Sequence, residues 1–156
     1  MFFIDILVKV FTNQIFISSG LAWILAQVIK MVYYYRQFHR LNFRLLVGTG
    51  GMPSAHSSLV SCLATVIGIK EGFESTFFII SLFLAIIIMS DAAGVRRAAG
   101  KQAEVLNQLS DEIYAGKGIR QERLKELLGH SPRQVFAGCF VGIVTGVIFM
   151  ALPKFI

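Results

Sequence analysis

Four apolar stretches divide the chain, and polar segments separate them. They cover approximately residues 15–35, 56–69, 76–89 and 135–152. Each approaches the ~20 residues that a helix needs to cross a bilayer, and the second is the shortest. The pattern therefore predicts four transmembrane helices.

The beginning of the chain is apolar as well, but it differs from a signal peptide. It carries Asp5 and Lys9, and it lacks a basic leading segment and a small-residue cleavage site. We expect an interfacial or re-entrant helix there.

Composition agrees with a membrane protein. Of the 156 residues, 55% are hydrophobic and 15% are charged, which is too apolar for a soluble domain of this size. The sequence has no internal repeats and no low-complexity tracts. We therefore expect an all-α integral membrane protein in which residues 1–156 form a single transmembrane helical domain.

Basic residues concentrate in two of the polar segments. Twelve of the 15 lysines and arginines lie near the end of the first apolar stretch or in the polar segments after the first and the third. The positive-inside rule then predicts a multi-pass protein of the cell membrane with both segments in the cytoplasm and both termini outside. Because topology and anionic headgroups account for the net charge of +6, we expect membrane lipids as partners and no nucleic acid.

The longest polar segment, residues 96–133, is predicted to be a cytoplasmic helical insertion. It divides into two short helices around the Gly-rich turn "YAGKG". The second of these helices has an apolar stripe under a charged face, which is typical of a helix lying on a surface. The stripe consists of Ile119, Leu124, Leu127 and Leu128.

Small residues recur at helical spacing in two of the apolar stretches. Gly138, Gly142 and Gly146 form a doubled G-x-x-x-G pattern, which lets another helix approach closely. Such a seam in so small a bundle also favours a homo-oligomer. The second stretch carries an interior seam of small polar residues, namely Ser54, Ser58, Ser61 and Thr65. Cys62 and Cys139 have no metal-ligand spacing, so we interpret them as packing residues.

The segment "PSAHS", residues 53–57, opens the second apolar stretch. Pro53 ends any preceding helix, Ser54 suits an N-cap, and His56 falls in the first turn. One interpretation is a helix cap beside an interfacial histidine. The other is a phosphate site, because the free N–H groups of a helix start attract anions and an imidazole lies within reach.

The segment "SDAAGVRR" closes the third apolar stretch. Asp91, Arg96 and Arg97 are explained either as a membrane stop signal or as part of an anion pocket, since a guanidinium group offers a planar fork to phosphate oxygens. These residues end on the same predicted side of the membrane as His56.

The segment "HSPRQ" opens the fourth apolar stretch. Ser131, Pro132 and Gln134 match an N-cap, an N1 proline and the third residue of a capping box, whereas capping leaves His130 unexplained. Two histidines and several cations thus gather at one face, without a cluster of metal ligands. This set favours metal-independent phosphoryl transfer, in which one histidine attacks phosphorus and the other protonates the leaving oxygen.

"PSAHS" resembles the "PSGHS" motif of the type-2 phosphatidic acid phosphatase and vanadium-dependent haloperoxidase superfamily, and the whole chain is similar to its small divergent branch. The resemblance implies that His56 is the general acid and that Ser54 binds phosphate. "HSPRQVFAG" resembles a second motif, which implies that His130 is the nucleophile that forms a phosphohistidine. It implies no cofactor.

Several positions depart from the superfamily pattern. Leu124 stands where an arginine is usual, so the resemblance leaves Arg96 or Arg97 to hold the phosphate. Gln134 stands in place of the aspartate that orients the nucleophile, and Asp91 is the substitute. The first motif is reduced to Lys30, which we include with Arg44 among the predicted phosphate ligands.

Three hypotheses follow from the sequence. The leading one is a membrane phosphatase for a lipid phosphate or diphosphate. The second is a catalytically silent relative that binds anionic headgroups or phosphate, and the third is a structural membrane subunit. For the first, we expect Ser54, His56, Arg96 or Arg97, and His130 to line one cavity at the cytoplasmic membrane boundary.

Overall fold

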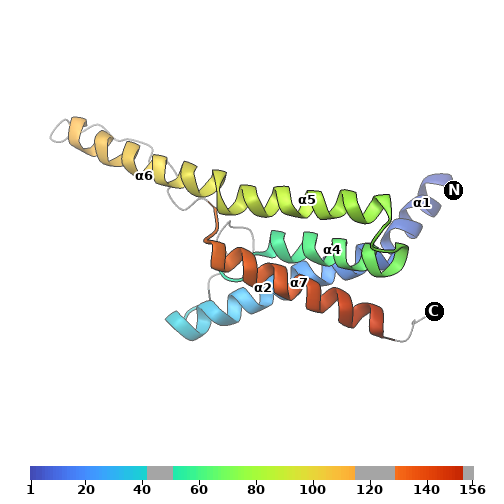
Figure 1. Ribbon diagram of the computed structural model, residues 1–156. Helices are drawn as coiled ribbons and strands as arrows, with labels where there is room; N and C mark the ends of the chain where they lie inside the picture. Colours follow the sequence, from blue (N-terminus) through green and yellow to red (C-terminus); the bar gives the residue numbers. More distant parts are fainter. Residues whose placement is uncertain (42–50, 115–128, 153–156) are drawn as a thin grey trace.

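The computed structural model describes residues 1–41, 51–114 and 129–152, and the regular structure in these ranges is entirely helical. Figure 1 shows an elongated bundle in which the N-terminus and the end of the last helix lie toward the same end. The helices are α1 (Phe2–Phe11), α2 (Gln14–Phe38), α4 (Ala55–Glu71), α5 (Thr76–Ala93), α6 (Val95–Tyr114) and α7 (Pro132–Ala151). The prediction of an all-α fold is confirmed.

Helix α4 forms the centre of the bundle, in contact with α2, α5 and α7. It is rich in small residues, and Ser54, Ser58 and Ser61 are buried along it. The Ser58 hydroxyl donates to the carbonyl oxygen of Ala22 at 2.9 Å, which joins α4 to α2. The predicted seam of small polar residues therefore lies inside the bundle.

The glycines of α7 allow α7 and α4 to approach closely. A Cβ atom on Gly138 would overlap the carbonyl oxygen of Ser54, and one on Gly142 would overlap that of Ser58. Gly146 is less confined, because its Cβ would lie 3.2 Å from side-chain atoms of Thr65. The repeated G-x-x-x-G pattern thus serves packing within the chain, as small residues at a helix interface do.

Among the described residues, three helical segments are long and apolar enough to cross a membrane: α2, the run from α5 into α6, and α7. Helix α4 has 17 residues, fewer than the other three, and is enclosed by them. A helix of this length rises about 25 Å at 1.5 Å per residue, somewhat less than the roughly 30 Å hydrocarbon core. The fourth membrane crossing therefore stays a prediction.

The predicted helix at the beginning of the chain is present as α1. None of its residues is buried, and Lys9 pairs with Asp5 at 3.1 Å one turn away. Its position at the membrane interface stays a prediction.

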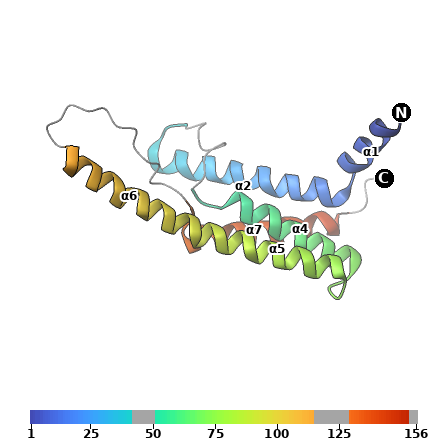
Figure 2. The same ribbon diagram turned by 90° about the horizontal axis from the view of Figure 1, so that it is seen from above.

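Helix α6 is longer than the short helix expected before the Gly-rich turn. It spans 20 residues and continues from α5 away from the bundle (Figure 2). The segment contains no proline and is rich in Ala, Gln, Glu and Leu, which favour helix over many turns. Most of the Gly-rich turn and the whole predicted second helix, including its apolar stripe, lie outside the described residues.

Candidate functional site

Most of the predicted site residues that the structure describes gather at one end of the bundle. The C-terminal ends of α2 and α5 lie there together with the N-terminal ends of α4 and α7 (Figures 1 and 2). We call this region, made of residues 30–38, 51–57, 90–93 and 129–135, the polar end. Arg97 is exposed on α6, just beyond it; Arg44 and the side chain of Arg96 lie outside the described part of the chain.

Ser54 caps α4, as its position in "PSAHS" predicts. Its hydroxyl oxygen accepts from the Ser57 N–H at 3.3 Å and from the Ser57 hydroxyl at 3.0 Å. Its own N–H donates to the carbonyl oxygen of Gln134 at 3.0 Å, so the starts of α4 and α7 are joined directly. Ser54 is fully buried, and the bond from its N–H to Gln134 fixes the relation between these two helices.

The two histidines predicted to be catalytic occupy different environments. His56 is exposed in the first turn of α4, whereas His130 is only 5% exposed. The His130 N–H donates to the carbonyl oxygen of Ala92 at 2.9 Å. This bond holds the start of α7 at the end of α5, one residue along the chain from Asp91.

Gln134, which replaces the aspartate of the superfamily pattern, has a structural role. Its side-chain oxygen accepts from the Ser131 N–H at 2.9 Å, and its own N–H donates to the Ser131 hydroxyl oxygen at 3.4 Å. These reciprocal bonds form the predicted capping box, with Pro132 at the first helical position.

A cavity of about 440 Å³ lies at the polar end between α2 and the start of α7. Its volume falls in the range of small-molecule sites. The side chain of Lys30 contributes to its wall although the residue is only 4% exposed. The cavity is lined by Lys30, Tyr33, Tyr34, Gln37, Phe38, Gly51, Met52, Ser131, Arg133 and Gln134.

Gly51 makes room for the buried lysine. Its φ is +82°, which favours glycine, and a Cβ there would lie 3.0 Å from Cδ of Lys30. The glycine before "PSAHS" thus has two reasons to lack a side chain. It turns the backbone, and it leaves space for the Lys30 stem to reach the cavity.

The cavity wall is cationic. It contains Lys30 and Arg133, and none of the described residues that line it is Asp or Glu. Within the described ranges no salt bridge to Lys30 is formed. Two cations, two tyrosines and the capped start of α7 are groups that bind an oxyanion.

The predicted site residues divide into two sets. Lys30 lines the cavity, and Ser131, which also lines it, follows His130 directly. Ser54, His56, Asp91, Arg97 and His130 do not line it, although all but Arg97 belong to the polar end. A single cavity shared by Ser54, both histidines and an arginine therefore stays a prediction.

Sequence reasoning missed Arg133, Tyr33 and Tyr34 as cavity residues. A signal for the tyrosines exists, because residues 30, 33, 34 and 37 share one face of a helix and end an otherwise apolar stretch with polar groups. Arg133 carried no such signal. Only the packing of α7 beside α2 brings it to the cavity that Lys30 lines.

Among the described residues, no group of three or more His, Cys, Asp or Glu side chains is placed to hold a metal ion. The described residues of the polar end carry imidazole, carboxylate, cationic and hydroxyl groups, among them His130, Asp91, Lys30 and Ser54.

Fold and site together define an all-helical membrane protein with a cationic cavity at one end of its bundle. Residues 11–145 match the family model described as the "Divergent PAP2 family", where PAP2 denotes type-2 phosphatidic acid phosphatase. The chain belongs to this family, as the resemblance in its motifs predicted.

A relative in Bacillus subtilis (strain 168) extends the comparison over almost the whole chain. It is 40% identical over 151 residues, covering 90% of this chain and 96% of its own length, and bears the name "Uncharacterized membrane protein YuiD". No solved structure matches the chain.

Proposed function

We propose that the protein is a membrane phosphatase that hydrolyses a lipid phosphate or diphosphate at its polar end. The observation that carries this proposal is the buried Lys30 in the wall of a cavity without acidic residues among its described lining. A buried ammonium group loses several kcal/mol of hydration unless an opposite charge compensates it. A phosphate group in the cavity supplies that charge.

In the proposed reaction, an imidazole nitrogen of His130 attacks phosphorus while the bond from phosphorus to the leaving oxygen breaks. His56 gives a proton to the leaving oxygen, and water then hydrolyses the phosphohistidine. Ser54 and Arg96 or Arg97, with Lys30 and Arg44, are the proposed phosphate ligands, and Asp91 orients His130. No cofactor or metal takes part.

The environments of the two histidines support this division of roles. The exposed imidazole of His56 can exchange protons with water. The buried His130 is held by its backbone at the junction of α5 and α7, which restricts the positions that its ring can adopt. We further propose that the polar end faces the cytoplasm, because the basic segments flank it.

A second function is favoured by the capping box of Gln134. The side-chain oxygen of Gln134 is engaged by the Ser131 N–H, and a neutral amide cannot stabilise an imidazolium as a carboxylate does. The alternative is a silent relative that binds an anionic lipid headgroup or phosphate through the same cavity without hydrolysing it.

A phosphate-release assay separates the two functions. Purified protein is offered a series of lipid phosphates and diphosphates, and His130→Ala and His56→Ala variants are measured in parallel. We expect His130→Ala to abolish turnover of every substrate because no nucleophile remains. We expect His56→Ala to recover part of its rate on a nitrophenyl phosphate, whose leaving group needs no proton.

Wild-type protein that releases phosphate from none of these substrates, yet still binds them, would establish the silent relative instead. Full activity of His130→Ala would show that another residue is the nucleophile.

A further inference from the structure

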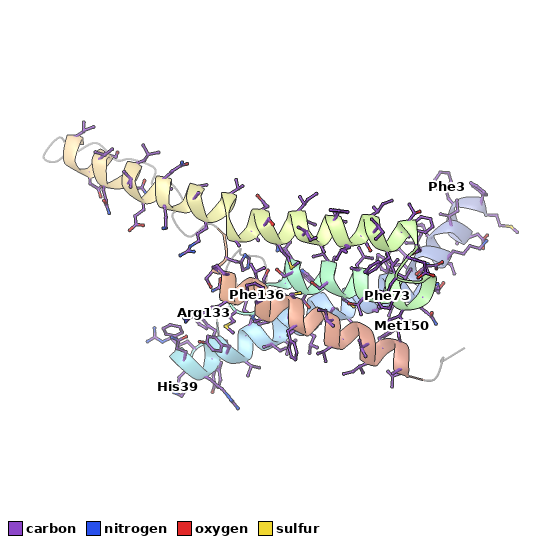
Figure 3. All side chains as sticks on the ribbon, in the orientation of Figure 1. Phe3, His39, Phe73, Arg133, Phe136 and Met150 are labelled. Carbon is purple, nitrogen blue, oxygen red and sulfur yellow. The ribbon has the colours of Figure 1, made fainter. Side chains whose placement is uncertain are left out.

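Arg133 lies where a helix by itself disfavours a positive charge. It follows Pro132 as the second residue of α7, at the positive end of the helix dipole. Its side chain is exposed at the start of α7 (Figure 3), and it lines the same cavity as Lys30. An anion bound between the two cations would offset both the unfavourable position of Arg133 and the burial of Lys30.

We propose that Arg133 and Lys30 form a two-cation clamp for a terminal phosphate dianion, with Arg133 in the role that the superfamily pattern gives to the arginine missing at Leu124. The inference rests on the proposed function for its substrate class. It puts Arg133 in the place of Arg96 or Arg97, which the proposed function takes over from the sequence as phosphate ligands. Arg97 is exposed on α6 and does not line the cavity.

The clamp joins two helices that the fold brings together at the polar end. Lys30 reaches the cavity from α2 along Gly51, and Arg133 reaches it from the first turn of α7. Arginine can give two parallel hydrogen bonds to one phosphate, whereas lysine acts as a point charge. We therefore assign orientation of the phosphate to Arg133 and charge compensation to Lys30.

The rest of the wall indicates what the phosphate is attached to. Tyr33, Tyr34, Phe38 and Met52 line the cavity beside the two cations. Such a wall suits the apolar part of a phosphate monoester next to its charged group. The chemistry shared by all candidate ligands is the phosphate dianion, and its source is either a lipid headgroup or free phosphate.

Ligand-dependent thermal unfolding of the purified full-length protein in detergent tests the clamp. The probes are inorganic phosphate, dihexanoyl phosphatidic acid and, as the control without a terminal phosphate dianion, dihexanoyl phosphatidylcholine. The variants are Arg133→Gln, Arg133→Lys and the matched control Arg40→Gln, which removes an exposed positive charge near the same end of the bundle but outside the cavity.

We expect Arg133→Gln to raise the dissociation constant for the phosphate probes at least tenfold, Arg133→Lys to have an intermediate effect, and Arg40→Gln to match the wild type. Without ligand, Arg133→Gln should unfold at the same temperature as the wild type or slightly above it, because a cation leaves the start of a helix. A wild-type dissociation constant in Arg133→Gln for both probes would overturn the clamp.

The probes also identify the source of the phosphate. Tighter binding of dihexanoyl phosphatidic acid than of inorganic phosphate supports the clamp with a lipid headgroup, and equal binding supports it with free phosphate. Binding that depends on Arg133 without any turnover leaves the clamp intact and removes the phosphatase. Turnover together with phosphate binding that does not depend on Arg133 removes the clamp and leaves the phosphatase intact.

Discussion

Two cavities lie at opposite ends of α2, and they differ in chemistry far more than in size. The cavity at the polar end measures about 440 Å³, and the one between α1, α2 and α4 about 540 Å³. The wall of the larger cavity has no charged side chain among its described residues and includes Trp23, Leu59 and Leu63. The smaller contains a buried lysine and an arginine without an acidic residue in its described lining.

Charge balance, and not volume, distinguishes the two cavities, and it is the reason why we propose the polar end as the site of function. An apolar cavity can accept any hydrocarbon chain at little cost in free energy. A buried cation is costly without a partner of opposite charge, so a cationic cavity favours an anion. The polar end is also where His56 and His130 lie.

The largest difference between the two cavities is expected when the charge of Lys30 is removed. We expect Lys30→Met to weaken phosphate binding by about a hundredfold, since charge-assisted hydrogen bonds contribute roughly 1.5–3 kcal/mol. The same variant should unfold at a higher temperature without phosphate, because an apolar side chain replaces a buried cation of similar length. Trp23→Leu, in the other cavity, should leave phosphate binding unchanged. Thermal unfolding with and without phosphate measures all three effects.

The G-x-x-x-G glycines of α7 offer a second contrast between the two ends of the bundle. Gly138→Ala places a Cβ against the backbone of Ser54 at the polar end, whereas Gly146→Ala meets only the side chains of Thr65 and Val66. We expect Gly138→Ala to reduce the free energy of unfolding by about 1–3 kcal/mol, as overpacking does, and to impair phosphate binding. Gly146→Ala should change stability by less than about 0.5 kcal/mol. Equal effects in the two variants would contradict the close contact at Ser54.

A third contrast comes from one glycine in each cavity wall. Gly51→Ala forces an unfavourable φ and presses on Lys30, so we expect a loss of about 1–3 kcal/mol. A Cβ atom on Gly20, within α2, would meet nothing within 4 Å, so Gly20→Ala should stabilise the protein by roughly 0.5–1 kcal/mol. Equilibrium unfolding in mixed micelles gives both values. A stabilised Gly51→Ala protein would exclude the proposed space requirement of Lys30.

Local signals in the sequence predicted much of this structure. The caps at Ser54 and Ser131, the capping box of Gln134 and the glycine seam depend on residues a few positions apart, and all are confirmed. The prediction of a short helix before the Gly-rich turn is wrong, because helix-favouring residues continue from α5 up to that turn. The meeting of Lys30 and Arg133 in one cavity was missed, since it depends on how two distant helices pack.

The most direct test of the central claim is to trap the covalent intermediate. Wild-type and His130→Ala proteins are mixed with a lipid phosphate carrying ³²P, quenched within one turnover, and digested for mass spectrometry. We predict an acid-labile phosphoryl group on His130 in the wild type and none in His130→Ala. A substrate that turns over without labelling His130, or that labels another residue, would contradict the proposed mechanism.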